Sequence, residues 1–390
     1  MKLEYSFFVL FLCFCTVTCV LSPDDKKKSE KKKNKSSTIE GRFVVDDKMK
    51  KHLINDNHVK KSDEFSDRHF RSGATLAFIT PWNKDGYRLG KDAAKKFTHL
   101  SPVWFDVTVL EHDEFGCKID GNHNINRDWI EQVRQNNPQI KLIPRFLFQK
   151  WTQQTVMNFL NDEQTSHRCA VSVLEFIQRN DFDGIVFEFY VELMYASRGK
   201  ALEAAVEIIE QWAELFRKAK KEIIVPMAPA IQYGTMESNI APYPFLKRIV
   251  QAVDYLMLMT YDYSGPEFEG VAPLPWVKTN VEYPLQDEPE DAQKILLGVN
   301  FYGYFDDPKT SGRTAGLVRD FIQRLKENPE LSLVWDKTSE EHAIFKNKKP
   351  IGYFPTVRGI ESRIEAARTL NTGIGIWELG QGLDEFTDLL

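Results

Sequence analysis

The sequence predicts an α/β fold in which eight parallel strands alternate with helices and close into a (β/α)8 TIM barrel. Three observations support this prediction. Short apolar runs rich in strand-forming residues recur eight times after Arg71, segments with helical spacing lie between them, and the runs are apolar on both faces, as in strands covered by helices. An open doubly wound sheet is the alternative, but the loop GYRLG at 86–90 lacks the G-x-G-x-x-G turn of that class.

The eight predicted strands share this apolar character, and they are ATLAFIT (74–80), THLSPVWFDVTVL (98–110), IKLIPRFLF (140–148), FDGIVFEFY (182–190), EIIVPMAPA (222–230), VDYLMLMTYD (253–262), KILLGVNFYGY (294–304) and GIGIWELG (373–380). Predicted helices between them include 170–180, 201–221 and 361–370. The long connection from 304 to 370 also holds SLVWDK and PIGYFPT, which predict a small β-containing insertion between strands 7 and 8.

Length and charge limit the class of protein. A chain of 390 residues with 42% hydrophobic content can bury one barrel-sized domain with appendages or two ordinary domains. The net charge of -5 and the pI near 6.0 provide no basic surface for nucleic acid. A neutral or weakly anionic partner is therefore predicted.

The N-terminal part predicts targeting rather than fold. Residues 1–21 hold an apolar run of signal-peptide type, which predicts entry into the secretory pathway and no membrane span after cleavage. Residues 22–71 are polar and Lys-rich, carry a glycosylation sequon at Asn34, and predict either a solvated linker or an electrostatic arm for anionic surfaces. Cys117 and Cys169 lie outside the signal, and they either form one disulfide or remain buried thiols.

Four predicted strands carry motifs that resemble those of glycoside hydrolase family 18. FDGIVFEFY resembles the fourth-strand signature D-G-x-D-x-D-x-E, LMTYDY the sixth-strand M-x-Y-D motif, GVNFYG the seventh strand and GIGIWELG the eighth. The motifs occur in the family's order, so 72–390 is expected to form a family 18-like barrel. The resemblance implies an oligosaccharide partner such as chito-oligosaccharides. The Lys-rich leader and the C-terminal ending further resemble a chitinase-like lectin branch, which is secreted or lysosomal and binds chitin-type glycans.

The resemblance also implies substrate-assisted hydrolysis, in which the last acid of the signature protonates the glycosidic oxygen and the substrate's N-acetyl carbonyl attacks the anomeric carbon. Val186, Glu188 and Tyr190 stand at its three acidic positions after Asp183. A phenol with a pKa near 10 is a poor proton donor, and losing a positioned acid costs about 10²–10⁴ in rate. The expected function is therefore a catalytically inactive saccharide-binding protein.

Two alternatives stay open. Glu192 would be a relocated acid, but along an extended strand it lies about 6.6 Å from position 190, whereas proton transfer needs about 3 Å. Only a distorted strand end would place it correctly. The other alternative is a scaffold that binds a cell-surface or sorting receptor and keeps a vestigial cleft.

The predicted sugar site lies at the carboxyl ends of the strands, where barrel sites are built. Trp377 offers an aromatic plane for a pyranose ring. The family resemblance implies that Tyr261 and Asp262 hold an acetamido group. Met259 has the same inward direction by strand alternation, although core packing alone would explain it.

Further candidates are weaker. Glu188 is either a ligand contact or an acid paired inside the barrel, and Arg145 is the residue that would pair with it. Tyr190 can bind a sugar hydroxyl. Trp82 and Trp104 are aromatic candidates that pack against scaffold as often as against ligand. No pattern in the sequence indicates a cofactor or a metal site.

Overall fold

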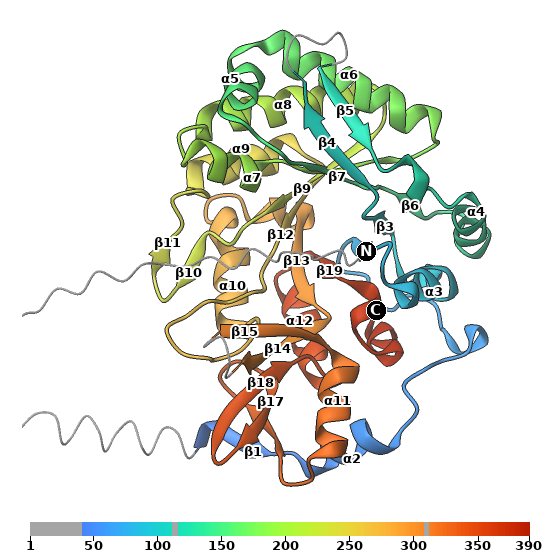
Figure 1. The fold of residues 1–390 in the computed structure, drawn as a ribbon, viewed down its shortest axis with the longest axis vertical. Coiled ribbons are helices and arrows are strands. Elements are labelled where there is room, and N and C mark those ends of the chain that lie inside the picture. Colours follow the sequence, from blue (N-terminus) through green and yellow to red (C-terminus); the bar gives the residue numbers. More distant parts are fainter. Residues whose placement is uncertain (1–40, 111–115, 308–311) are drawn as a thin grey trace, which may run out of the picture. The chain divides into compact units, whose positions relative to one another are not determined.

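We describe residues 41–110, 116–307 and 312–390 of a computed structural model of the chain (Figure 1). Within them, Phe43–Leu390 form one compact unit. In these ranges no helix is long and apolar enough to cross a membrane. The predicted signal peptide and the sequon at Asn34 lie outside the described residues, so entry into the secretory pathway stays a prediction.

The main sheet hydrogen-bonds in the order β5-β4-β7-β8-β9-β12-β13-β19-β2-β3-β6. Its strands are β2 (Thr75–Ile79), β3 (His99–Pro102), β4 (Phe105–Val109), β5 (Cys117–Asp120), β6 (Lys141–Leu142), β7 (Arg145–Phe148), β8 (Gly184–Glu188), β9 (Glu222–Met227), β12 (Tyr255–Leu258), β13 (Ile295–Asn300) and β19 (Gly373–Trp377). Neighbours pair in parallel except β4 and β5, which form an antiparallel pair. Each of the eight predicted strands contains a strand of this curled sheet, so the predicted α/β class is confirmed.

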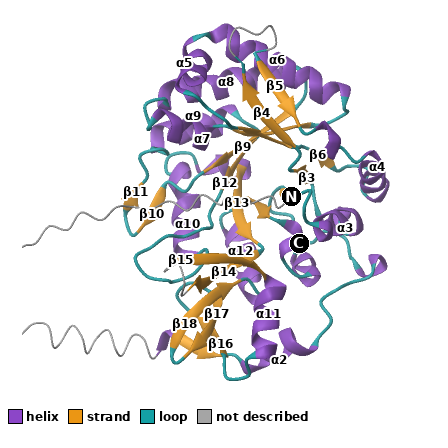
Figure 2. Cartoon of the chain, viewed as in Figure 1, coloured by secondary structure: helices purple, strands orange, loops and turns teal. Residues whose placement is uncertain are grey.

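Helices flank the sheet, and α6, α8 and α9 lie side by side along it (Figure 2). The helices of this part are α3 (Lys84–Asp92), α4 (Arg127–Asn136), α5 (Gln153–Asn161), α6 (Glu163–Arg179), α7 (Tyr190–Ser197), α8 (Leu202–Lys218), α9 (Tyr243–Ala252), α10 (Leu274–Glu282) and α12 (Val357–Thr369). In α8, Ala205, Ile209, Trp212 and Phe216 recur at helical spacing and all are buried. The helices thus cover the apolar outer face of the sheet.

The predicted insertion between strands 7 and 8 is a second sheet, in the order β1-β16-β17-β18-β14-β15. Its elements are β14 (Tyr302–Asp307), β15 (Gly312–Leu317), α11 (Val318–Glu327), β16 (Ser332–Asp336), β17 (Glu341–Lys346) and β18 (Lys349–Phe354). β1 (Phe43–Val45) completes it from the N-terminal side by pairing antiparallel with β16.

The predicted linker at 22–71 is wrong in its last part. After β1, helix α2 (Asp47–Asn55) is capped by Asp46, whose side chain accepts a hydrogen bond from the Met49 N–H. Leu53 is fully buried, and the helix contacts α11 of the insertion. The charge-rich composition of this segment did not predict a helix. A short helix can pack on a large domain with few apolar residues, so its apolar pattern is weak.

Cys117 and Cys169 form a disulfide that joins β5 to α6. The alternative of two buried thiols is thereby settled in favour of the pair. The bridge closes a segment of 52 residues, which limits the freedom of the unfolded chain.

We expect the double variant Cys117→Ser/Cys169→Ser to lose about 2–4 kcal/mol of unfolding free energy, because the unfolded chain gains the entropy that the bridge removes. Urea unfolding followed by tryptophan fluorescence measures the loss relative to the oxidised wild-type chain. The wild-type chain under reducing conditions should show a similar loss. A loss below about 0.5 kcal/mol would contradict this account.

Candidate functional site

The fourth strand ends earlier than the sequence pattern predicts. β8 stops at Glu188, and helix α7 begins at Tyr190. Phe187 and Phe189 are two positions apart and point to the same side of the sheet, where their rings stack with centroids 4.2 Å apart. Phe187 also stacks on Trp212 of α8 at 4.3 Å. The backbone leaves the extended conformation at Phe189, whose ψ is -28°.

Helix α7 follows from its own spacing. Tyr190, Leu193 and Met194 are buried on one side, whereas Glu192 in the first turn is exposed. Arg198 ends the helix in the left-handed conformation at φ 54°. The expectation that 182–190 is extended throughout is therefore wrong for its last two residues.

Tyr190, at the position where the resemblance to the signature expects an acid, does not reach the open face. Its side chain is 1% exposed, and its hydroxyl is buried with no hydrogen-bond partner among the described residues. Burial raises its pKa far above the ordinary tyrosine value. In this conformation Tyr190 is a core residue, and the predicted contact with a sugar hydroxyl has no geometric basis.

Arg145, at the start of β7, contacts two other candidates: Glu188 at the end of the neighbouring β8, and Trp377 at the end of the more distant β19. Its Nη1 lies 3.2 Å from Oε2 of Glu188, which is partly exposed. The guanidinium also lies 5.7 Å from the ring centre of Trp377, a cation–π distance. Trp377 is half-buried and packs against Phe78 at 5.2 Å. The predicted stacking plane is therefore present, and Arg145 shares it.

Asp262 is held by a group that the sequence did not reveal. The hydroxyls of Tyr302 and Tyr304 both donate to its Oδ1, the latter at 2.9 Å. The residue adopts the left-handed conformation, with φ at 62°, which costs energy outside glycine and is frequent at functional sites. Burial raises the pKa of this carboxyl, and the two tyrosine hydroxyls oppose that shift. Tyr261 beside it is 8% exposed.

The two tyrosines could have been found as alternate residues of FYGY after the seventh strand, which point to one face.

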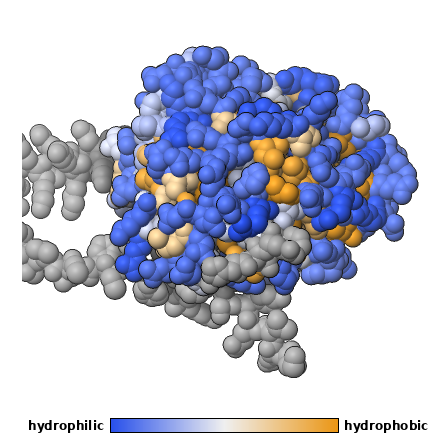
Figure 3. Space-filling model, turned by 90° about the horizontal axis from the view of Figure 1, so that it is seen from above, coloured by the Kyte–Doolittle hydropathy of each residue, from blue (hydrophilic) through white to orange (hydrophobic). Residues whose placement is uncertain are grey.

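Of the remaining predictions, Met259 directly follows β12 and is partly buried. Trp104 is 3% exposed and donates its indole N–H to Tyr87, so it belongs to the scaffold. Trp82 is 73% exposed. The face drawn in Figure 3 is mostly hydrophilic, with a hydrophobic patch near its middle.

Glu192 and Glu188 form a carboxyl pair in different surroundings. The side chain of Glu192 is exposed overall, but partial desolvation of its carboxyl group, and then the charge of Glu188, raise its pKa above the usual value. Glu188 by contrast has the guanidinium of Arg145 beside it. A carboxyl group with a raised pKa near a second carboxyl group is a candidate proton donor.

A cavity of about 620 Å³ lies at the opposite, amino-terminal ends of the strands and is lined by Arg68, His99, Lys141 and Tyr255. His99 and Lys141 there hold the carboxylate of Glu222. Residues at this end of such folds serve stability rather than chemistry. The candidate site remains at the carboxyl ends.

An aromatic plane and partly exposed carboxyl groups at the strand ends describe a carbohydrate-active α/β domain. The chain belongs to the glycosyl hydrolases family 18, whose pattern matches residues 75–382. Family membership makes an oligosaccharide the expected class of partner.

Relatives agree with this assignment. The cortical fragment-lytic enzyme of Bacillus subtilis (strain 168) is 27% identical over 256 residues, which cover 63% of this chain and 58% of that protein. The chain thus spans less than two thirds of that relative's length. The spore cortex-lytic enzyme SleL of Bacillus megaterium QM B1551 superposes with a TM-score of 0.65 at 17% identity, covering 81% of this chain and 73% of that one.

The chitinase from Chromobacterium violaceum ATCC 12472 superposes with a TM-score of 0.63 at 16% identity, over 81% of this chain and 98% of that one. At such identities the superpositions show the fold alone. The expected chitinase-like lectin is wrong, because the curated relative is named as a lytic enzyme. Secretion or delivery to the lysosome stays a prediction. None of these relatives points to a receptor partner.

Proposed function

We propose that this chain is a slow glycosidase that takes an oligosaccharide of 2-acetamido sugars at the carboxyl ends of its strands, with Glu192 as the proton donor. The observation that carries this proposal is the start of α7 at Tyr190. Because the chain turns helical there, the spacing of about 6.6 Å that an extended strand would impose on Glu192 does not apply. The raised pKa of Glu192 favours the protonated form that a general acid needs.

The proposed reaction is substrate-assisted. Glu192 gives its proton to the glycosidic oxygen while the carbonyl oxygen of the 2-acetamido group attacks the anomeric carbon, and the glycosidic bond breaks. Water then adds to that carbon, opens the cyclic intermediate and returns a proton to Glu192. Tyr261 and Asp262 would hold the acetamido group as donor and acceptor. Glu188, which contacts Arg145, would lie near the developing positive charge.

A second candidate is that hydrolysis is lost altogether. It is favoured by Tyr190, a buried phenol at the position where the family signature has its acid. Glu192 is also exposed, so water competes for its carboxyl group and weakens its positioning. The rate of the proposed reaction is therefore expected to lie about 10²–10⁴ below that of a site with a positioned acid.

We also infer that the main sheet closes on itself. β3 and β4 follow one another in the chain, as do β6 and β7, so each pair can be treated as one interrupted strand. β3 pairs with β6, and β4 pairs with β7. With those two joints counted as continuous, the strand order returns to its start, as a (β/α)8 barrel requires.

Binding to the site is expected to depend on Trp377. Replacing it with alanine removes the stacking plane and the surface against which Arg145 lies, and should weaken chito-oligosaccharide binding by about 2 kcal/mol, roughly thirtyfold. Titration calorimetry with oligomers of N-acetylglucosamine measures this.

Trp82→Ala is the matched comparison, because Trp82 is an exposed tryptophan and makes no ring contact with Arg145. We expect it to change the affinity less than threefold. If Trp377→Ala binds as tightly as the parent chain, or if Trp82→Ala carries the loss instead, the site has been placed at the wrong residues.

A further inference from the structure

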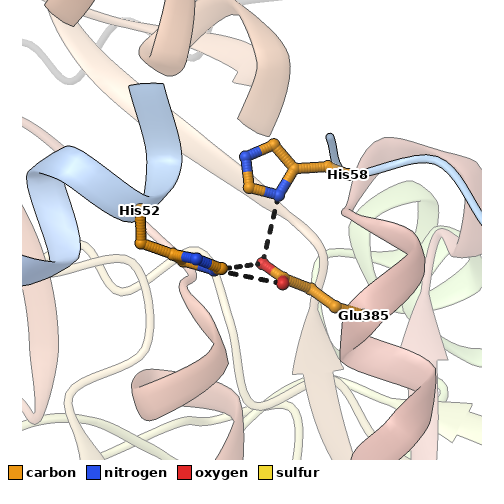
Figure 4. Close-up of side chains that lie close together, drawn as sticks. All are labelled: His52, His58 and Glu385. Carbon is orange, nitrogen blue, oxygen red and sulfur yellow. Dashed lines mark hydrogen bonds and ion pairs between the residues drawn. The ribbon is translucent and has the colours of Figure 1, made fainter. Parts of the chain in front are cut away.

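Two histidines and a glutamate meet where the N-terminal segment lies against the end of the chain, outside the site described above (Figure 4). His52 comes from α2, His58 from the segment that follows, and Glu385 from the 3-10 helix η7 (Asp384–Leu389). Nε2 of His52 lies 3.1 Å from both carboxylate oxygens of Glu385, and Nδ1 of His58 lies 3.4 Å from Oε1. One ligand atom from each residue lies within 4.8 Å of the others.

The other nitrogen of each ring is already engaged. Nδ1 of His52 is 2.6 Å from a carboxylate oxygen of Asp56, and Nε2 of His58 is 3.0 Å from the carbonyl oxygen of Leu53. Both partners only accept hydrogen bonds, so these two nitrogens carry the ring protons. In neutral imidazoles the lone pairs of the opposite nitrogens then point toward the carboxylate of Glu385. Three electron-pair donors facing one another repel unless one ring takes up a proton or a metal cation lies between them.

The surroundings also favour a cation. In η7, Asp384 is paired with Arg88 and Asp388 with Lys60. Glu385, the acid between them, has no lysine or arginine partner among the described residues. Nδ1 of His58 is buried and lacks a hydrogen bond in the described part of the chain, although it faces Glu385.

The distances fit a specific class of ion. Ligand atoms about 2.0–2.1 Å from a tetrahedral Zn²⁺ lie about 3.3 Å from one another, close to the two separations measured here. Histidines that bind metals commonly give their second N–H to a carboxylate or a backbone carbonyl, as His52 gives its N–H to Asp56 and His58 to Leu53. We propose that His52, His58 and Glu385 form a binding site for a divalent transition metal such as Zn²⁺.

Such an ion would fasten chain segments that are 333 residues apart in sequence, from His52 to Glu385. Because the unfolded chain does not hold the three ligands together, binding would stabilise the folded domain in proportion to the free metal concentration. The site is thus a structural clamp, and the oligosaccharide site does not depend on it for any chemical step.

The test uses the whole chain after treatment with a chelator and dialysis. We expect titration calorimetry with Zn²⁺ to give one site per chain, and thermal unfolding to shift upward as Zn²⁺ is added. Glu385→Gln and His58→Ala should each weaken Zn²⁺ binding at least a hundredfold and remove the thermal shift. Asp56→Asn, which changes only the hydrogen bond that orients His52, should weaken it about 10–100-fold.

His123→Ala is the matched control, because His123 is exposed on η3 (Asn122–Asn124) away from the cluster. It should bind Zn²⁺ like the parent chain. Circular dichroism separates loss of binding from loss of folding, and Glu385→Gln is the variant least able to disturb packing. The proposal is overturned if the parent chain shows no Zn²⁺ binding below about 1 mM, or if the Glu385→Gln variant binds as well as the parent. In either case the cluster is a set of imidazolium–carboxylate pairs.

Discussion

Glu192→Gln is expected to lower the turnover of chito-oligosaccharides by about 10²–10⁴, because glutamine keeps the size of the side chain and removes the proton that the leaving oxygen needs. Release of reducing ends or of a fluorogenic leaving group, at high enzyme concentration, measures so slow a reaction. Sugar binding should be nearly unchanged, since the carboxyl group acts in the transition state rather than in the bound complex.

The pH dependence provides a second readout. A general acid works in its protonated form, so the rate should fall as the pH rises through the pKa of Glu192. Burial and the nearby charge of Glu188 raise that pKa, and the falling limb should therefore lie above the value of about 4.3 that is usual for glutamate. Removing Glu188 as Glu188→Gln removes one of the two causes, and the limb should move to lower pH.

Glu207→Gln is the matched control, because Glu207 is an exposed glutamate on α8. It should leave turnover unchanged. Turnover that survives Glu192→Gln would exclude Glu192 as the acid. A parent chain with no turnover above background at any pH between about 4 and 8 would decide for the second candidate, in which the hydrolytic step is lost.

Tyr190→Glu introduces the acid that the family signature has at this position. It is expected to lower the free energy of unfolding by about 3–5 kcal/mol without restoring activity. The side chain of Tyr190 is 1% exposed, and no described residue offers its hydroxyl a partner. A carboxyl group at this place would be buried without a partner, which costs several kcal/mol or forces the group to remain protonated. Urea unfolding measures the loss, and the same activity assay measures the lack of rescue.

Tyr190→Phe is the control for this prediction. It removes a buried hydroxyl that makes no hydrogen bond, so it should be neutral or slightly stabilising. Turnover that rises at least a hundredfold in Tyr190→Glu, with stability kept, would show that α7 rearranges and that position 190 belongs to the open face.

Several features could be predicted from local pattern. Strand-length apolar runs separated by helical segments specified the α/β class, because a strand that is buried on both faces is apolar at nearly every position. The insertion between β13 and β19 was visible as a connection too long to lack structure. The position of Trp377 at the end of the last strand followed from the same pattern. The sequence also shows Val186 and Tyr190 at two positions where the resemblance expects acids.

Tertiary contacts decided the rest. The backbone left the extended conformation at Phe189, so that β8 ended at Glu188 and Tyr190 began a helix with its side chain in the core, which alternation along a strand cannot foresee. Asp262 meets Tyr302 and Tyr304 some forty residues later, and His52 meets Glu385 across 333 residues. Such contacts depend on where whole elements are placed, whereas periodicity in the sequence reports only which face of one element is apolar.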